Sequence, residues 1–276
     1  MATAKSWRPR RRGIESYMSS ISTKTCPQGV ELIAQIEAWY GSSLGREVAA
    51  QEAACLETML EGIFGHYLLQ VGGDDVFREV VAGSHVRYAI SLPPAFHRGG
   101  LGMRIAASPQ MMPIASDSLD AVFLPHSLDF AADPRQVLGE AERVLIPEGR
   151  LIILGFNALS PWALLSLGSP GRVPWCGHFL TRYRVVEWLS LLGFDLEMQR
   201  MLVFQAPWGD SRWCSGSLLD RAGRHFWPAL GGVYALRAVK RVSTLTPLRP
   251  SWKTRRKLLP GNAVEPTTRG TSRRHV

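Results

Sequence analysis

His126 is the residue whose type and position best fit chemistry. It stands at the end of an apolar run, in Leu124-Pro125-His126-Ser127. An imidazole titrates near neutral pH, so His126 could be a general base that takes a proton from a hydroxyl or an amine. The alternative is a hydrogen-bonded histidine that holds the loop at the end of a strand. We predict His126 as the catalytic candidate, with both roles open.

Two adjacent glycines are the second candidate feature. Gly72 and Gly73 follow the predicted strand from His66 to Val71 and precede Asp74. Glycine adopts backbone conformations that other residues avoid, and it lets backbone N–H groups approach a ligand closely. Turns contain Gly-Gly-Asp routinely, so the meaning of these glycines depends on the elements around them.

The stretch from Ser116 to Asn157 predicts the elements that position these residues. Residues 121–124 are a short apolar run, which suits a strand buried on both faces. Asp133 and Pro134 are a favoured helix cap and a favoured first helical residue. Apolar residues then recur at helical spacing, and a second apolar strand follows at residues 151–154. Strand, helix and strand in this order predict a right-handed parallel crossover, so the expected fold class is α/β.

The same criteria extend this sheet along the chain. Parallel strands are expected at residues 66–71, 85–90, 103–106, 119–124 and 151–156. Helices are expected over 30–40, 44–64 and from Thr181 to Leu192, and an antiparallel edge pair over 196–204 and 233–239. Ligands bind such sheets at the carboxyl ends of the strands, where the strand order reverses. The glycine loop and His126 should therefore meet at one site.

Three motifs carry a resemblance to a known family: SLDAV at residues 118–122, LPH at 124–126 and RVLIPEGRLII at 143–153. With them, residues 66–157 resemble a class I S-adenosylmethionine-dependent methyltransferase, of the type 11 group found in small bacterial proteins. The resemblance implies a Rossmann-like, mostly parallel seven-stranded sheet with an antiparallel edge hairpin, flanked by helices. It also implies a transferase that uses S-adenosyl-L-methionine as cofactor for methylation.

The first loop departs from the family pattern. The family usually shows an acidic residue followed by three alternating glycines, where the acid helps to hold the methionine end of the cofactor. This chain has Gln70, Gly72, Gly73 and Asp74 in that loop. Gln70 can accept a hydrogen bond but brings no charge for the cofactor's ammonium group. The resemblance nevertheless assigns these four residues to cofactor binding.

Two further acidic positions of the family are also replaced. Ser91 stands where an acid would bind the ribose hydroxyls, and Ser108 where an acid would contact the adenine. Met111, Met112 and Leu124 keep the apolar character expected beside the cofactor. Each lost carboxylate should weaken binding by ~1–3 kcal/mol, and so lower the affinity by orders of magnitude unless other groups compensate.

Asn157 and Trp162 are the predicted acceptor-binding residues. Asn157 follows the fifth strand at the mouth of the site, although Asn at such a position is often a turn residue. Trp162 belongs to a Trp-rich acceptor and lid region over residues 158–230. Its aromatic side chains either form a lid over an apolar acceptor or cover the edge of the sheet. Peripheral contact with a membrane surface is a weaker alternative.

Composition and charge suggest the domain organisation. The 276 residues are 46% hydrophobic and 20% charged, as in globular proteins. The net charge of +9 resides in the two ends of the chain, so the middle is mildly acidic. The expected parts are a disordered basic tail over 1–28, a methyltransferase-like domain over 29–245 and a second disordered basic tail over 246–276. The domain would comprise a helical prelude over 29–65, a cofactor-binding core over 66–157 and the acceptor region.

The sequence also limits partners and location. No apolar run approaches the ~20 residues that span a bilayer, and no apolar signal segment follows the basic N-terminus. Four scattered cysteines lack metal-ligand spacing, so we expect free thiols in the cytoplasm and no metal. Solvated tails explain the basic charge better than a nucleic-acid partner does. The expected partner is a small-molecule acceptor.

Two functions of different class remain. The favoured hypothesis is an enzyme that transfers a methyl group from S-adenosylmethionine to a small or apolar acceptor by in-line displacement. The alternative is a catalytically inactive, methyltransferase-like binding protein with a degenerate cofactor site, which the residues Gln70, Asp74, Ser91 and Ser108 favour. Modification of nucleic acid with the help of the basic tails is a third and weaker hypothesis.

Overall fold

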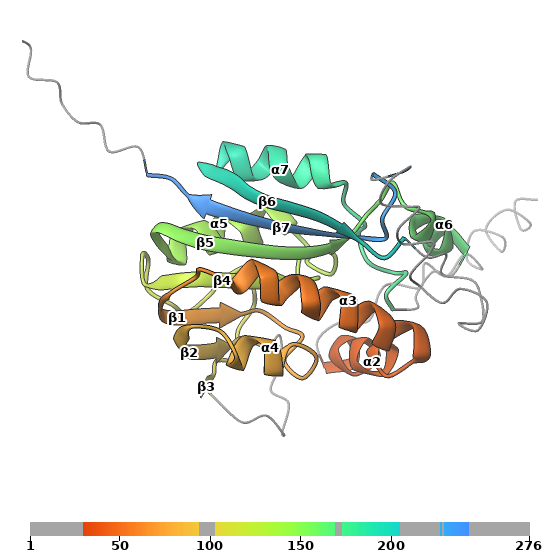
Figure 1. The fold of residues 1–276 in the computed structure, drawn as a ribbon, viewed down its shortest axis with the longest axis horizontal. Helices are drawn as coiled ribbons and strands as arrows, with labels where there is room; N and C mark the ends of the chain where they lie inside the picture. Colours follow the sequence, from red (N-terminus) through yellow and green to blue (C-terminus); the bar gives the residue numbers. More distant parts are fainter. Residues whose placement is uncertain (1–29, 94–102, 169–172, 205–226, 228, 243–276) are drawn as a thin grey trace, which may run out of the picture. The chain divides into compact units, whose positions relative to one another are not determined.

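A seven-stranded sheet forms the centre of the fold, with the strand order β3-β2-β1-β4-β5-β7-β6 (Figure 1). Strands β1 to β5 are parallel, and β7 is antiparallel to its neighbours β5 and β6. The strands are β1 Gly65–Gln70, β2 Val86–Ser91, β3 Met103–Arg104, β4 Leu119–Pro125, β5 Leu145–Phe156, β6 Phe194–Leu202 and β7 Val233–Lys240. The predicted Rossmann-like sheet with an antiparallel edge pair is confirmed.

The structure is a computed structural model that describes residues 30–93, 103–168, 173–204, 227 and 229–242. Its helices are α2 Val30–Tyr40, α3 Ser43–Leu60, α4 Arg78–Ala82, α5 Pro134–Val144, α6 Pro161–Gly168 and α7 Arg182–Leu191. The predicted tails over 1–28 and 246–276, and much of the predicted acceptor region, lie outside the described residues.

Helices cover both faces of the sheet (Figure 1). Leu138 of α5 and Val185 of α7 belong to the core on one face, whereas Leu56 of α3 and Val81 of α4 belong to the core on the other. Strand β4 lies between the two cores, because its consecutive apolar side chains point alternately to each. This placement explains the unbroken apolar run that predicted a strand buried on both faces.

The crossover from β4 through α5 to β5 forms as predicted, with a longer second strand. The Asp133 side chain accepts hydrogen bonds from the backbone N–H groups of Arg135, at 2.9 Å, and Gln136, at 3.3 Å. Strand β5 begins at Leu145 rather than at residue 151, because Leu145 pairs with Leu119 ahead of a bulge in the register. The carboxyl ends of β4 and β5 lie side by side, because Pro125 pairs with Leu154.

Two other expectations concern membrane-spanning segments and cysteines. Within the described residues, every helix is too short or too polar to cross a membrane. Cys55 is a buried free thiol, but Cys176 takes part in a disulfide. The interpretation of all four cysteines as free thiols is therefore wrong at Cys176.

Candidate active site

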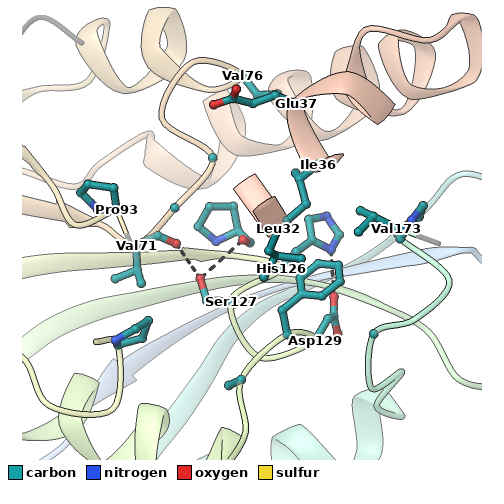
Figure 2. A pocket seen from close by; sticks show the side chains of 18 of the residues that line it. Leu32, Ile36, Glu37, Val71, Val76, Pro93, His126, Ser127, Asp129 and Val173 are labelled. Carbon is teal, nitrogen blue, oxygen red and sulfur yellow. Dashed lines mark hydrogen bonds and ion pairs between the residues drawn. The ribbon is translucent and has the colours of Figure 1, made fainter. Parts of the chain in front are cut away.

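A cavity of about 760 Å³ opens at the carboxyl ends of β1 and β4. The loop after β1 and the loop after β4 form two of its walls, and α2 contributes a third. Figure 2 shows Leu32 and Ile36 of α2 in the middle of the view, between Val71 and Val173. Ser127 joins the two loops, since its hydroxyl donates a hydrogen bond of 2.6 Å to the carbonyl of Val71. The cavity thus lies where ligands bind open α/β sheets.

The glycine loop has the backbone conformation that its sequence suggests. Gly72 and Gly73 have φ angles of +82° and +64°, a region that strongly favours glycine. A Cβ at Gly73 would also lie 3.1 Å from a ring carbon of Phe77 and from Cγ of Pro125. The Gln70 amide donates a 2.9 Å hydrogen bond to the carbonyl of Gly72. Gln70 therefore supports the loop and does not line the cavity.

His126 lies between two buried carboxylates. Its Nδ1 is 2.9 Å from Oδ2 of Asp129, and its Nε2 is 3.0 Å from Oε1 of Glu52. The backbone of His126 is left-handed, with a φ of +53°, which is uncommon outside glycine and points to a constrained site. Only 5% of the side chain is exposed, and both carboxylate side chains are fully buried. Both ring nitrogens are therefore engaged.

This buried cluster connects four parts of the fold. Glu52 comes from α3, and its Oε2 accepts a 2.9 Å hydrogen bond from the hydroxyl of Tyr40 at the end of α2. Oδ2 of Asp129 also accepts a 2.9 Å hydrogen bond from the backbone N–H of Phe156 at the end of β5. The cluster of Tyr40, Glu52, His126 and Asp129 thus holds the helical prelude against the strand ends.

The cluster also decides the protonation of His126. Burial lowers the pKa of His126, but the charge of Glu52 and the hydrogen bonds that the ring donates to both carboxylates outweigh it, so the pKa rises from 6.5 to about 9. At neutral pH the ring is an imidazolium that donates both N–H groups. It carries no lone pair for a substrate proton, so the geometry supports the role of holding the loop and not that of a general base.

The sequence did not identify Glu52 as a site residue. The signal that could have found it is a charged residue on an apolar helix face. Glu52 shares the buried face of α3 with Val48, Leu56 and Met59, at spacings of one and two turns. Charged residues are seldom fully buried unless they are paired, so the position itself indicates a partner.

The predicted cofactor residues divide into two groups. Gly72, Gly73, Asp74 and Ser108 line the cavity. Gln70, Ser91, Met111, Met112 and Leu124 do not. Met111 is 74% exposed, and Leu124 points into the core below α5, because adjacent strand residues face opposite sides of the sheet.

The predicted acceptor residues also lie outside the cavity lining. The Asn157 amide donates 2.9 Å hydrogen bonds to the carbonyls of Ala229 and Gly231, and its oxygen accepts one of 3.1 Å from the N–H of Leu159. Trp162 is fully buried and stacks on Phe156, which does line the cavity. Both side chains therefore support residues around the cavity without lining it themselves.

Comparison with known proteins agrees with the fold. Residues 85–153 match the family model described as a methyltransferase domain. The uncharacterised Escherichia coli (strain K12) protein YafS is 34% identical over 196 residues, which cover 68% of this chain and 75% of YafS. The chain belongs to the class I S-adenosylmethionine-dependent methyltransferases, in the family that contains YafS.

Solved structures share the same fold. An S-adenosylmethionine-dependent methyltransferase of Thermotoga maritima superposes with a TM-score of 0.54 at 14% identity, over 76% of this chain and 97% of that chain. Geranyl diphosphate methyltransferase, in complex with GPP and sinefungin, gives a TM-score of 0.51 at 15% identity, over 69% and 78% of the two chains. At these identities the likeness concerns the fold alone.

Proposed function

We propose that this protein transfers the methyl group of S-adenosylmethionine to a small or apolar acceptor by in-line displacement. The observation that carries the proposal is the cavity at the ends of β1 and β4, with the glycine loop on one side and apolar side chains on the other. Its volume of about 760 Å³ falls within the range of roughly 300–1,000 Å³ that is usual for small-molecule sites.

The residues of the first loop fit this cofactor. Gly72 and Gly73 present bare backbone to the cavity. Among the described residues, the N–H groups of Gly73 and Asp74 have no hydrogen-bond acceptor, so they are available to a ligand carboxylate. Ser108 offers a hydroxyl from the loop after β3. The bound cofactor would supply a methyl group on a sulfonium, which is already activated for transfer.

The part of the cavity near His126 suits an apolar acceptor. Its lining there comes from Leu32, Ile36 and Tyr40 of α2, and from Phe130 and Phe156. These side chains exclude water and offer a large apolar contact area. Because the Tyr40 hydroxyl is hydrogen-bonded to Glu52, α2 is held in the position that closes this side.

His126 abstracts no proton in this proposal. Both of its N–H groups are donated to carboxylates, so the chain contributes alignment and water exclusion rather than general-base catalysis. The acceptor should then carry a reactive lone pair at the working pH, as a neutral amine or a thiolate does.

Calorimetric titration of the full chain with S-adenosylhomocysteine tests cofactor binding. We expect micromolar affinity, and loss of binding in Gly72→Leu, whose new side chain would start in the open space beside the loop. Gly62→Leu is the matched control, because Gly62 also has a positive φ of +75° and open space around it but does not line the cavity. Absence of binding to the wild type at millimolar ligand would refute the proposal.

A catalytically inactive binding protein is the second candidate. The paired state of His126 and the replaced carboxylates at Gln70, Ser91 and Ser108 favour it. The two functions differ in turnover. If the wild type binds S-adenosylmethionine but forms no S-adenosylhomocysteine with a panel of apolar amines, thiols and phenols, the binding role is correct.

A further inference from the structure

Asp74 lies in an unusual electrostatic position in the first loop. Its Oδ2 is 3.3 Å from Nη2 of Arg104, which ends β3, and the two side chains are only 14% and 15% exposed. Both residues line the cavity. The second oxygen of Asp74, Oδ1, is buried and has no hydrogen-bond partner among the described residues. An unpaired buried carboxylate oxygen is uncommon and costly, so it marks a place where a donor is missing.

A second unpaired polar atom lies at the same strand ends. The hydroxyl of Ser91, the last residue of β2, is also buried without a partner among the described residues. Ser91 is in register with Arg104. The next residue, Leu92, joins this corner to the first loop, because its carbonyl accepts a 3.2 Å hydrogen bond from the N–H of Gly72. Two unpaired polar atoms therefore occupy one corner, formed by the ends of β1, β2 and β3.

Nucleoside ligands provide suitable donors for such a corner. In doubly wound α/β folds, a carboxylate at the end of the second strand commonly binds ribose hydroxyls. Here the second strand ends in Ser91, and the buried carboxylate that lines this corner belongs to Asp74. A carboxylate can accept hydrogen bonds from both hydroxyls of a diol, whereas a serine offers a single oxygen.

We propose that Asp74, positioned by Arg104, binds the ribose diol of the cofactor and takes over this role from the end of the second strand. The assignment rests on the proposed function, since it presumes an adenosine-containing ligand in the cavity. Arg104 acts through Asp74: its guanidinium holds Oδ2 and fixes the carboxylate, so that Oδ1 and the second lone pair of Oδ2 can accept from the two ligand hydroxyls. A single relocated carboxylate would then compensate for the acid that position 91 lacks.

The test compares two ligands on four proteins by calorimetry. The ligands are S-adenosylhomocysteine and its 2′,3′-dideoxy analogue, and the proteins are the wild type, Asp74→Asn, Arg104→Gln and Glu79→Gln. Asp74→Asn keeps the size of the side chain but removes its charge. Glu79, an exposed acid in α4 close to the same loop, serves as the control for loss of one negative charge.

We expect the wild type and Glu79→Gln to prefer the complete ligand over the dideoxy analogue by about 10- to 100-fold. Asp74→Asn should weaken binding of the complete ligand by a similar factor and leave binding of the analogue nearly unchanged, so that the preference disappears. Arg104→Gln should reduce the preference in the same direction, because the carboxylate loses its support. Thermal unfolding of each variant shows that the fold is retained.

Two results would overturn the assignment. Equal weakening of both ligands in Asp74→Asn would mean that the residue only shapes the loop, and no weakening of either would exclude contact with the ligand. These results refute the diol site and leave the proposed function intact. Failure of the wild type to bind either ligand would refute the proposed function, and the diol site with it.

Discussion

Oε1 of Glu52 lies 3.0 Å from Nε2 of His126, although 74 positions separate the two residues in the chain. Both side chains are buried, so the pair exists only because α3 packs across the end of β4. Removing one partner of a buried ion pair leaves an uncompensated charge, and such changes are strongly destabilising. The pair therefore joins α3 to the loop after β4, which forms a wall of the cavity.

Glu52→Ala should lower the free energy of unfolding by about 3–5 kcal/mol, because it leaves His126 and the Tyr40 hydroxyl without their partner. Urea denaturation measures this change. Glu57→Ala is the matched control, since Glu57 is an exposed acid on the same helix, and its effect should stay within about 0.5 kcal/mol. Equal effects of the two substitutions would show that the buried pair contributes nothing.

The stability of the protein should fall between pH 6.5 and pH 9. The pKa of His126 is raised from 6.5 to about 9 in the folded protein, so its stabilising effect is fully present below 6.5 and is lost as the pH rises through 9. The loss should be on the order of 3 kcal/mol. Denaturation curves across this range should show the decline in the wild type and a flatter profile in His126→Gln. Parallel profiles for both proteins would disprove the charged state of His126.

Gly73→Ala should destabilise the protein by about 1–3 kcal/mol and weaken cofactor binding. An alanine at position 73 would have a strained φ of +64°, and its Cβ would press on the side chains of Phe77 and Pro125. Gly139→Ala provides the contrast. Gly139 lies within α5 with open space around it, so this substitution should raise the free energy of unfolding by about 0.5–1 kcal/mol. Thermal unfolding and calorimetric titration measure the two effects. A neutral Gly73→Ala would contradict the constrained loop.

Asn157→Ala should act on stability rather than on recognition of the acceptor. It removes two hydrogen bonds to the carbonyls of Ala229 and Gly231 and one from the N–H of Leu159, at a cost of about 1–3 kcal/mol. The affinity for S-adenosylhomocysteine and the Michaelis constant for an acceptor should remain within a few-fold of wild type. A large rise in the Michaelis constant, with stability unchanged, would instead show that Asn157 contacts the acceptor directly, as the sequence suggested.

Local patterns predicted much of the fold. Asp133 and Pro134 specify the start of α5, because a side-chain cap and a fixed φ act within a single helical turn. The apolar run in β4 indicates a strand with helices on both faces, since only such a strand buries every side chain. Gly72 and Gly73 indicate the left-handed turn at the cavity, because that conformation strains other residues. These inferences need no knowledge of distant neighbours.

The pairing of charges, in contrast, depended on the tertiary structure. Local patterns suggested neither the contact of Glu52 with His126 nor that of Asp74 with Arg104, because each joins elements whose approach is set by the packing of helices and loops on the sheet. The role of His126 changes with that packing. An isolated imidazole at a strand end is a base near neutral pH, whereas the same ring between two buried carboxylates is held as a cation, since their charges and hydrogen bonds outweigh the cost of burial.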